Sequence, residues 1–161
     1  MSYPPAIYTA THPQVAARLH QTQREPDLVL RSGSEVRYLA SAESTGGLFG
    51  LFHWTMVAAG GGRSPHFHRT MAESFYILSG AVGLYDGEQW VRAGAGDYFY
   101  VPPGSIHDFR NDSDDPASML VLFTPGAPRE PYFENLHRLA EMTPVERDEF
   151  FRSHDNLLVA D

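Results

Sequence analysis

Two glycine-framed motifs hold three histidines and one glutamate at fixed spacing, and they constrain the fold of this chain more than any other feature. The motifs read Gly60-x5-His66-x-His68-x4-Glu73-x6-Gly80 and Gly96-x5-Pro102-x-Gly104-x2-His107-x3-Asn111. Alternate side chains of a strand share a face, so His66 and His68 can point into one interior. A tight bend then brings Glu73 back along the next strand. The turn signal Pro102-Pro103-Gly104 similarly returns His107 inward.

These four side chains form a complete ligand set for a divalent transition metal. Each histidine alone fits an ordinary core or surface position. A chance match at all ten motif positions has a probability on the order of 10^-12 per register. The ligand types suit Fe, Mn, Ni, Co, Cu or Zn and do not separate them. Four protein ligands leave up to two octahedral positions open, which indicates catalysis or ligand binding rather than a closed structural site.

Short apolar runs with regular turns predict an all-β domain, a sandwich or barrel, over residues 35–125. Asp86-Gly87 is a hairpin signal within it. The predicted strands are 36–40, 48–58, 73–78, 81–85, 90–92, 97–101, 106–110 and 119–123.

Helical spacing replaces the strand pattern in residues 129–155. Thr143, Pro144 and Glu146 read as an N-cap, a first-turn proline and a capping-box partner, so two C-terminal helices are predicted. They either cover a face of the β-domain or form a lid over its mouth. The chain thus divides into an N-terminal arm (1–34), a β-domain (35–125) and a C-terminal helical extension (126–161).

The N-terminal arm is weakly patterned. Val15, Ala16 and Leu19 predict a short helix over 13–22, which would pack on a barrel edge or reach a neighbouring subunit. The alternative is a partly ordered arm.

Composition excludes several kinds of chemistry. Cysteine and lysine are absent, which excludes disulfides, thiolate catalysis and lysine Schiff bases. The formal net charge of −8 argues against nucleic acid and anionic membranes as partners. No apolar run is long enough to span a membrane, and the start of the chain lacks the pattern of a signal peptide. We therefore expect a cytoplasmic protein.

Both motifs match the two signatures of the cupin superfamily at every defining position, and the chain resembles that family from Gly60 to Asn111. The fifteen residues between Gly80 and Gly96 are the spacing usual in microbial single-domain cupins. The resemblance implies a small antiparallel β-barrel, the double-stranded β-helix or jelly roll, with one metal inside. The ligand set resembles that of quercetinase-like flavonol dioxygenases. This implies that Glu73 is also the catalytic base that takes a proton from the substrate.

Strand alternation predicts an apolar lining for the metal cavity. The side chains that share a face with Glu73 or His107, and the inward-facing ones on the strand before His107, are aromatic or aliphatic. Such a lining favours a hydrophobic or aromatic small molecule as substrate. The alternative is that they fill the core of the barrel. His53 either lines the cavity, acts as a base or is structural. The predicted pocket residues are His53, Phe75, Ile77, Phe99, Val101 and Phe109.

Other polar side chains of the sequence are expected to lie in turns, at the surface or at the mouth of the cavity. Asn111 is expected to have a turn or hydrogen-bonding role rather than to bind the metal. Arg63 and Arg69 either meet an anionic substrate at the mouth or are solvated. The histidines expected at the surface are His12, His20, His137 and His154.

Three functions fit these observations. The first is a dioxygenase acting with O2 on an aromatic or enolic, flavonol-like compound. The second is a non-redox cyclase, isomerase or lyase of natural-product metabolism, in which the metal acts as a Lewis acid. The third is a small-molecule-binding cupin without turnover. We also expect a homodimer, because the chain is rich in aromatics, with contact through the N-terminal arm or the outer sheet carrying Tyr98 and Tyr100.

Overall fold

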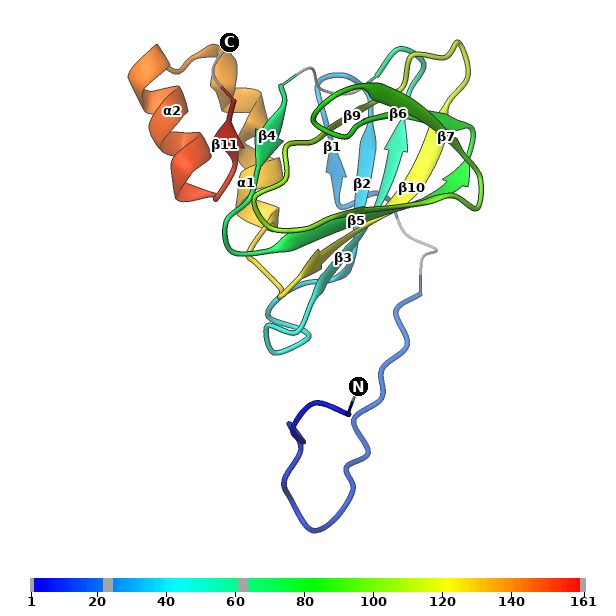
Figure 1. The fold of residues 1–161 in the computed structure, drawn as a ribbon, viewed down its shortest axis with the longest axis vertical. Coiled ribbons are helices and arrows are strands. Elements are labelled where there is room, and N and C mark those ends of the chain that lie inside the picture. Colours follow the sequence, from blue (N-terminus) through cyan, green and yellow to red (C-terminus); the bar gives the residue numbers. More distant parts are fainter. Residues whose placement is uncertain (1, 22–24, 61–63, 160–161) are drawn as a thin grey trace.

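A computed structural model describes residues 2–21, 25–60 and 64–159 of the chain (Figure 1). Its strands pair antiparallel throughout. The strands are β1 (Leu28–Val29), β2 (Glu35–Ala40), β3 (Gly50–Met56), β4 (His66–Phe67), β5 (Ala72–Ser79), β6 (Ala81–Tyr85), β7 (Trp90–Gly94), β8 (Tyr98–Val101), β9 (Asp108–Arg110), β10 (Ala117–Thr124) and β11 (Leu157–Leu158). The helices are α1 (Glu130–Asn135), the 3-10 helix η1 (Leu136–Ala140) and α2 (Pro144–Ser153).

The strands form three sheets. The largest has the order β1-β2-β3-β10-β5-β8, the second has the order β7-β6-β9, and the third is the pair β11-β4. Some neighbours in these sheets are distant in the sequence, since β10 lies between β3 and β5. The all-β prediction with two C-terminal helices is confirmed, and each predicted strand contains or overlaps an observed one.

The core lies on one face of the six-stranded sheet. Side chains of β3 and β10 alternate between buried and half-buried positions, as period-two strands with one covered face must. Phe52 and Trp54 on β3 and Val121 on β10 belong to this core. His53, between the two aromatics, therefore points to the opposite face of the sheet.

Gly80 shows why glycine is needed where the first motif ends. Its φ is +71°, in the left-handed region that favours glycine. A Cβ placed there would lie 2.6 Å from the carbonyl oxygen of Pro116. No other residue type fits this turn between β5 and β6 without a shift of backbone.

The C-terminal extension packs beside the ligand strand β4 (Figure 1). The predicted capping box at the start of α2 is present: Glu146 N donates to the Thr143 hydroxyl and Thr143 N donates to the Glu146 carboxylate. The strand β11 follows α2 and pairs with β4, so regular secondary structure continues after the two predicted helices.

The helix predicted over 13–22 is wrong for residues 13–21, which have no regular secondary structure; residue 22 lies outside the described residues. Residues 2–21 are exposed and extend away from the sheets (Figure 1). Without a packed apolar face, so short a helix is marginal in water. Among the helices the structure describes, none combines the length and apolarity needed to cross a bilayer.

Candidate metal centre and its cavity

Three strands bring the four motif side chains together. His66 begins β4, His68 follows it, Glu73 lies on β5, and His107 directly precedes β9. One ligand atom from each residue lies within 4.8 Å of those of the others. Two reciprocal main-chain hydrogen bonds hold His66 and His107 side by side: His66 N donates to His107 O (3.0 Å) and His107 N donates to His66 O (2.9 Å).

Main-chain carbonyls set the tautomer of all three imidazoles. Nδ1 of His66 lies 3.0 Å from the carbonyl oxygen of Ser64, and Nδ1 of His107 lies 3.1 Å from that of Ser105. Nδ1 of His68 contacts the carbonyl oxygen of Asp155. A carbonyl only accepts, so each Nδ1 carries the hydrogen and each neutral ring has its lone pair on Nε2. Metal-binding histidines are commonly oriented in this way.

The Glu73 carboxylate completes the cluster from β5. Its Oε2 lies 3.0 Å from Nε2 of His68 and 2.8 Å from Nε2 of His107, and all three side chains are buried. If both rings are neutral, their lone pairs face a carboxylate oxygen, which is electrostatically unfavourable. A cation at this point, either a proton or a metal ion, removes the conflict. Three imidazole nitrogens and one carboxylate fit a divalent transition metal.

The pKa values show how the metal-free centre would hold its charges. Burial raises the pKa of Glu73, but hydrogen bonds from His107 and His68 outweigh it and bring the pKa below its ordinary value. Burial lowers the pKa of His107, yet the hydrogen bond and charge of Glu73 raise it overall. Burial and the neighbouring His107 lower the pKa of His66 to about 3. An ionised Glu73 therefore shares a proton with His107 when no metal is bound.

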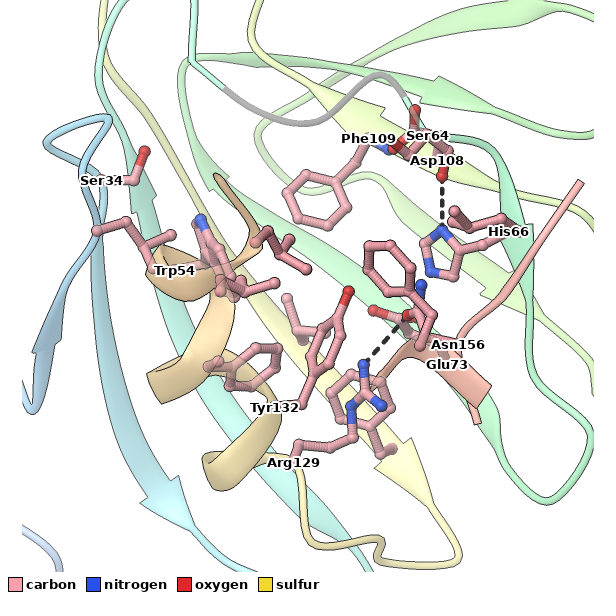
Figure 2. Close-up of a pocket in the computed structure, with 18 of the residues that line it drawn as sticks. Ser34, Trp54, Ser64, His66, Glu73, Asp108, Phe109, Arg129, Tyr132 and Asn156 are labelled. Atoms are coloured by element: carbon pink, nitrogen blue, oxygen red, sulfur yellow. Dashed lines mark hydrogen bonds between the residues drawn. The ribbon is translucent and has the colours of Figure 1, made fainter. Parts of the chain in front are cut away.

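A cavity of about 270 Å³ lies against this cluster, and His66 and Glu73 form part of its wall (Figure 2). The rest of the wall is mainly apolar and comes from two sources. Trp54 and Phe109 project from strands, whereas Tyr132 and Phe133 project from α1. The volume lies just below the usual range for small-molecule sites. Burial raises the pKa of Tyr132 to about 12, so its hydroxyl stays protonated and can donate a hydrogen bond.

The predicted pocket lining is only partly reproduced. Of the six predicted residues, all within the described chain, Phe109 alone lines the cavity. Phe75, Ile77 and Val101 face inward as alternation predicts, but they are buried in the core, and Phe99 packs against it. His53 lies on the opposite face of β3 from Trp54 and does not line this cavity.

The C-terminal extension supplies wall residues that sequence reasoning missed. Arg129 and Asn156 line the cavity together with Tyr132 (Figure 2). The helical period identified α1 correctly, but it gave no sign of which sheet the helix covers. Arg129 is one of twelve arginines, and nothing in its local sequence separates it from the others.

The remaining predicted residues that the structure describes are not part of the cluster. Asn111 has a hydrogen-bonding role, as predicted: its Nδ2 donates to the carbonyls of Val57 (3.1 Å) and Asp115 (2.7 Å). Arg69 is exposed, and Arg63 lies outside the described residues. Of the four histidines expected at the surface, His12, His20 and His137 are exposed. His154 is half-buried, with its ring centroid 4.5 Å from that of Phe150.

Comparisons with known proteins agree with this geometry. The family model of the Cupin domain matches residues 53–123, which contain all four cluster residues. Quercetin 2,3-dioxygenase of Bacillus subtilis (strain 168) is 28% identical over 116 residues, 70% of this chain and 32% of that enzyme. Polyketide synthase CurC of Streptomyces cyaneus is 29% identical over 101 residues, 62% of this chain and 64% of that protein. The chain thus covers less than two thirds of either relative.

A solved structure has a similar fold over more of the chain. The polyketide cyclase RemF of Streptomyces resistomycificus superposes with a TM-score of 0.54 at 23% identity. The match covers 78% of this chain and 93% of RemF. At this identity the likeness concerns the fold.

Proposed function

We propose that this chain, which belongs to the cupin superfamily, is a metal-dependent dioxygenase acting on a small aromatic or enolic compound. One observation carries the proposal: a cluster of three imidazoles and one carboxylate opens onto an apolar, aromatic cavity. The similarity to a quercetin 2,3-dioxygenase supports the same reaction class. Because the chain covers a third of that enzyme, substrate and activity stay proposals.

His66, His68, Glu73 and His107 would hold the metal, which is one of Fe, Mn, Ni, Co, Cu or Zn. When bound, such a metal polarises a substrate oxygen and, if redox-active, supplies electrons for reaction with O2. The protein itself holds the ligand side chains in position. The Nδ1 contacts with Ser64, Asp155 and Ser105 hold the three rings in one tautomer and orientation.

Glu73 is placed to take the proton of a substrate hydroxyl. It is one of two cluster residues that line the cavity, so its carboxylate borders both the imidazoles and the bound compound. Its lowered pKa keeps it ionised and therefore able to accept a proton. A positioned proton acceptor of this kind contributes about 10²–10⁴-fold to rate.

The aromatic walls select a planar compound and keep water out. Trp54 and Phe133 meet edge to face, with ring centroids 5.2 Å apart, and Trp54 meets Phe109 in the same way at 5.6 Å. Such packed rings offer flat apolar surface to a ring of the substrate. Exclusion of water protects a deprotonated substrate from reprotonation.

A second candidate is a non-redox enzyme of natural-product metabolism. The similarity to CurC favours it, because that relative is a polyketide synthase protein. The same residues would then bind an enol or carbonyl oxygen and move one proton without using O2.

Oxygen uptake separates the two candidates. The purified protein should first be analysed for metals and then loaded separately with each of the six candidate metals. Each form is then assayed with a panel of flavonols and catechols. We expect substrate-dependent O2 consumption with at least one redox-active metal. The His107→Ala variant should lose this activity, whereas His137→Ala, which changes an exposed histidine, should retain it. No uptake with any metal and compound would rule out the dioxygenase for this panel and favour the second candidate.

A further inference from the structure

Arg129 places a buried positive charge in the wall of the cavity. The residue is 3% exposed and precedes α1. Its Nη1 donates to the carbonyl of His154 at 2.7 Å, and its Nη2 makes a long contact of 3.4 Å with Oδ1 of Asn156. Nε is buried and has no hydrogen-bond partner. The side chain lies on the same cavity as Glu73 (Figure 2).

Aromatic rings surround this guanidinium, and the carboxylates of Glu73, Asp155 and Glu130 act on its charge without forming an ion pair with it. Its Cζ lies 4.2 Å from the ring centroid of Tyr132, 5.0 Å from that of Phe123 and 5.5 Å from that of Phe133. Among the residues that the structure describes, no carboxylate comes within ion-pair distance of it. Burial lowers the pKa of Arg129, although a guanidinium stays charged at physiological pH. A buried cation without an anionic partner is costly.

A purely structural role explains part of this arrangement. Arg129 joins the start of α1 to the segment after α2, since His154 and Asn156 accept its hydrogen bonds. Both acceptors are neutral, so an uncharged donor would serve the same purpose. The Nε donor is left without a structural explanation, and among the described residues no carboxylate contacts the charge directly.

We infer that Arg129 binds a carboxylate of the substrate, so that the natural ligand is an aromatic or enolic carboxylic acid. The inference rests on the proposed function and narrows its substrate class. Nη2 exchanges its long contact with Asn156 for one carboxylate oxygen, and Nε, on the same edge of the guanidinium, donates to the other. Two parallel hydrogen bonds of this kind are the characteristic way in which arginine binds carboxylates. The hydroxyl or enol of the same ligand then faces Glu73.

A matched pair of ligands tests the carboxylate subsite. 3-Hydroxy-2-naphthoate and 3-hydroxy-2-naphthamide have nearly the same shape and differ in charge. Their dissociation constants are measured by calorimetry at neutral pH on the metal-loaded and the chelator-treated protein. The wild type should bind the acid at least about tenfold more tightly than the amide, because a hydrogen bond to a charged group is stronger than one to a neutral group. Equal binding of the two compounds, or binding of neither, would overturn the inference.

Three variants assign the preference to a residue. Arg129→Gln keeps an uncharged hydrogen-bond donor but removes the charge, and it should bind both compounds with the affinity that the wild type shows for the amide. Arg129→Lys should keep part of the preference. Arg138→Gln removes an exposed charge from η1 and should bind as the wild type does. Retention of the full preference in Arg129→Gln contradicts the assignment.

The two forms of the protein separate this subsite from metal chelation and from the proposed reaction. If chelator treatment removes the preference while Arg129→Gln retains it, the acid binds through the metal and the subsite is wrong. If no compound supports O2 uptake but the preference depends on Arg129, the dioxygenase is wrong and the subsite stands.

Discussion

The main-chain carbonyl of Asp155 accepts a hydrogen bond from Nδ1 of His68, which precedes it by 87 residues. The carboxylate of Asp155 also accepts hydrogen bonds from Arg69 N (3.0 Å), Thr70 N (2.8 Å) and the Thr70 hydroxyl (2.7 Å). One residue of the C-terminal extension thus orients a cluster imidazole and fixes the bend between His68 and Glu73.

The Asp155→Asn variant should weaken metal binding about tenfold. This is the low end of the loss of affinity expected when a residue that orients a metal ligand is replaced. Asn tolerates the left-handed backbone of this position, where φ is +52°. Its amide, however, cannot accept all the hydrogen bonds that the carboxylate accepts. Competition with a chelating indicator measures the affinity. Asp148→Asn, on the exposed face of α2, is the control and should bind metal normally.

His68→Ala should reduce the bound metal per chain after dialysis, because the cluster then has one nitrogen fewer. Elemental analysis against His137→Ala gives the comparison. Full metal content in His68→Ala would mean that His68 is not a ligand.

Glu73→Gln should lower turnover by about 10²–10⁴-fold while a substantial fraction of the metal is retained. The amide preserves size and one ligand oxygen but loses basicity. Single-turnover rates on variant protein with measured metal content separate the two effects. If the metal-loaded variant stays active, Glu73 is not the base. His53 is then no substitute, since it faces away from the cavity.

Metal affinity should rise with pH through the pKa of His107. Its raised pKa means that metal-free protein holds a proton there above pH 6.5, the ordinary value of histidine. Metal must displace this proton, so below that pKa the affinity gains up to about tenfold per pH unit. Calorimetry in buffers of different ionisation enthalpy should detect the released proton. A pH-independent affinity between pH 6 and 8 would contradict the assignment.

The homodimer remains an expectation with two possible contacts. Tyr98 and Tyr100 on edge strand β8 are 62% and 54% exposed, and the arm exposes Tyr3 and Tyr8. Sedimentation at micromolar concentration should show a dimer. If the sheet is the contact, Tyr98→Ser/Tyr100→Ser should shift it to monomer and Tyr3→Ser/Tyr8→Ser should not. A monomeric wild type removes the expectation.

Local pattern was sufficient for the strands and the four cluster residues, because strand alternation and turn glycines act over a few residues. It failed for the helix over 13–22, whose apolar residues have nothing to pack against. It also failed for most of the cavity wall. Inward-facing side chains such as Phe75 and Ile77 fill the core, and the wall beside Glu73 comes from α1. Which sheet a helix covers depends on contacts between distant residues, and no periodicity in the chain encodes them.

The pairing of β11 with β4 makes the ligand strand and the C-terminal segment thermodynamically linked. Leu158 lies opposite His66, and Val159 N donates to the carbonyl of Pro65. If separation of these strands weakens metal binding, then bound metal must suppress that separation by the same factor. The amide hydrogens of β11 therefore report on the occupancy of the centre through their exchange with solvent, although none of them belongs to a metal ligand.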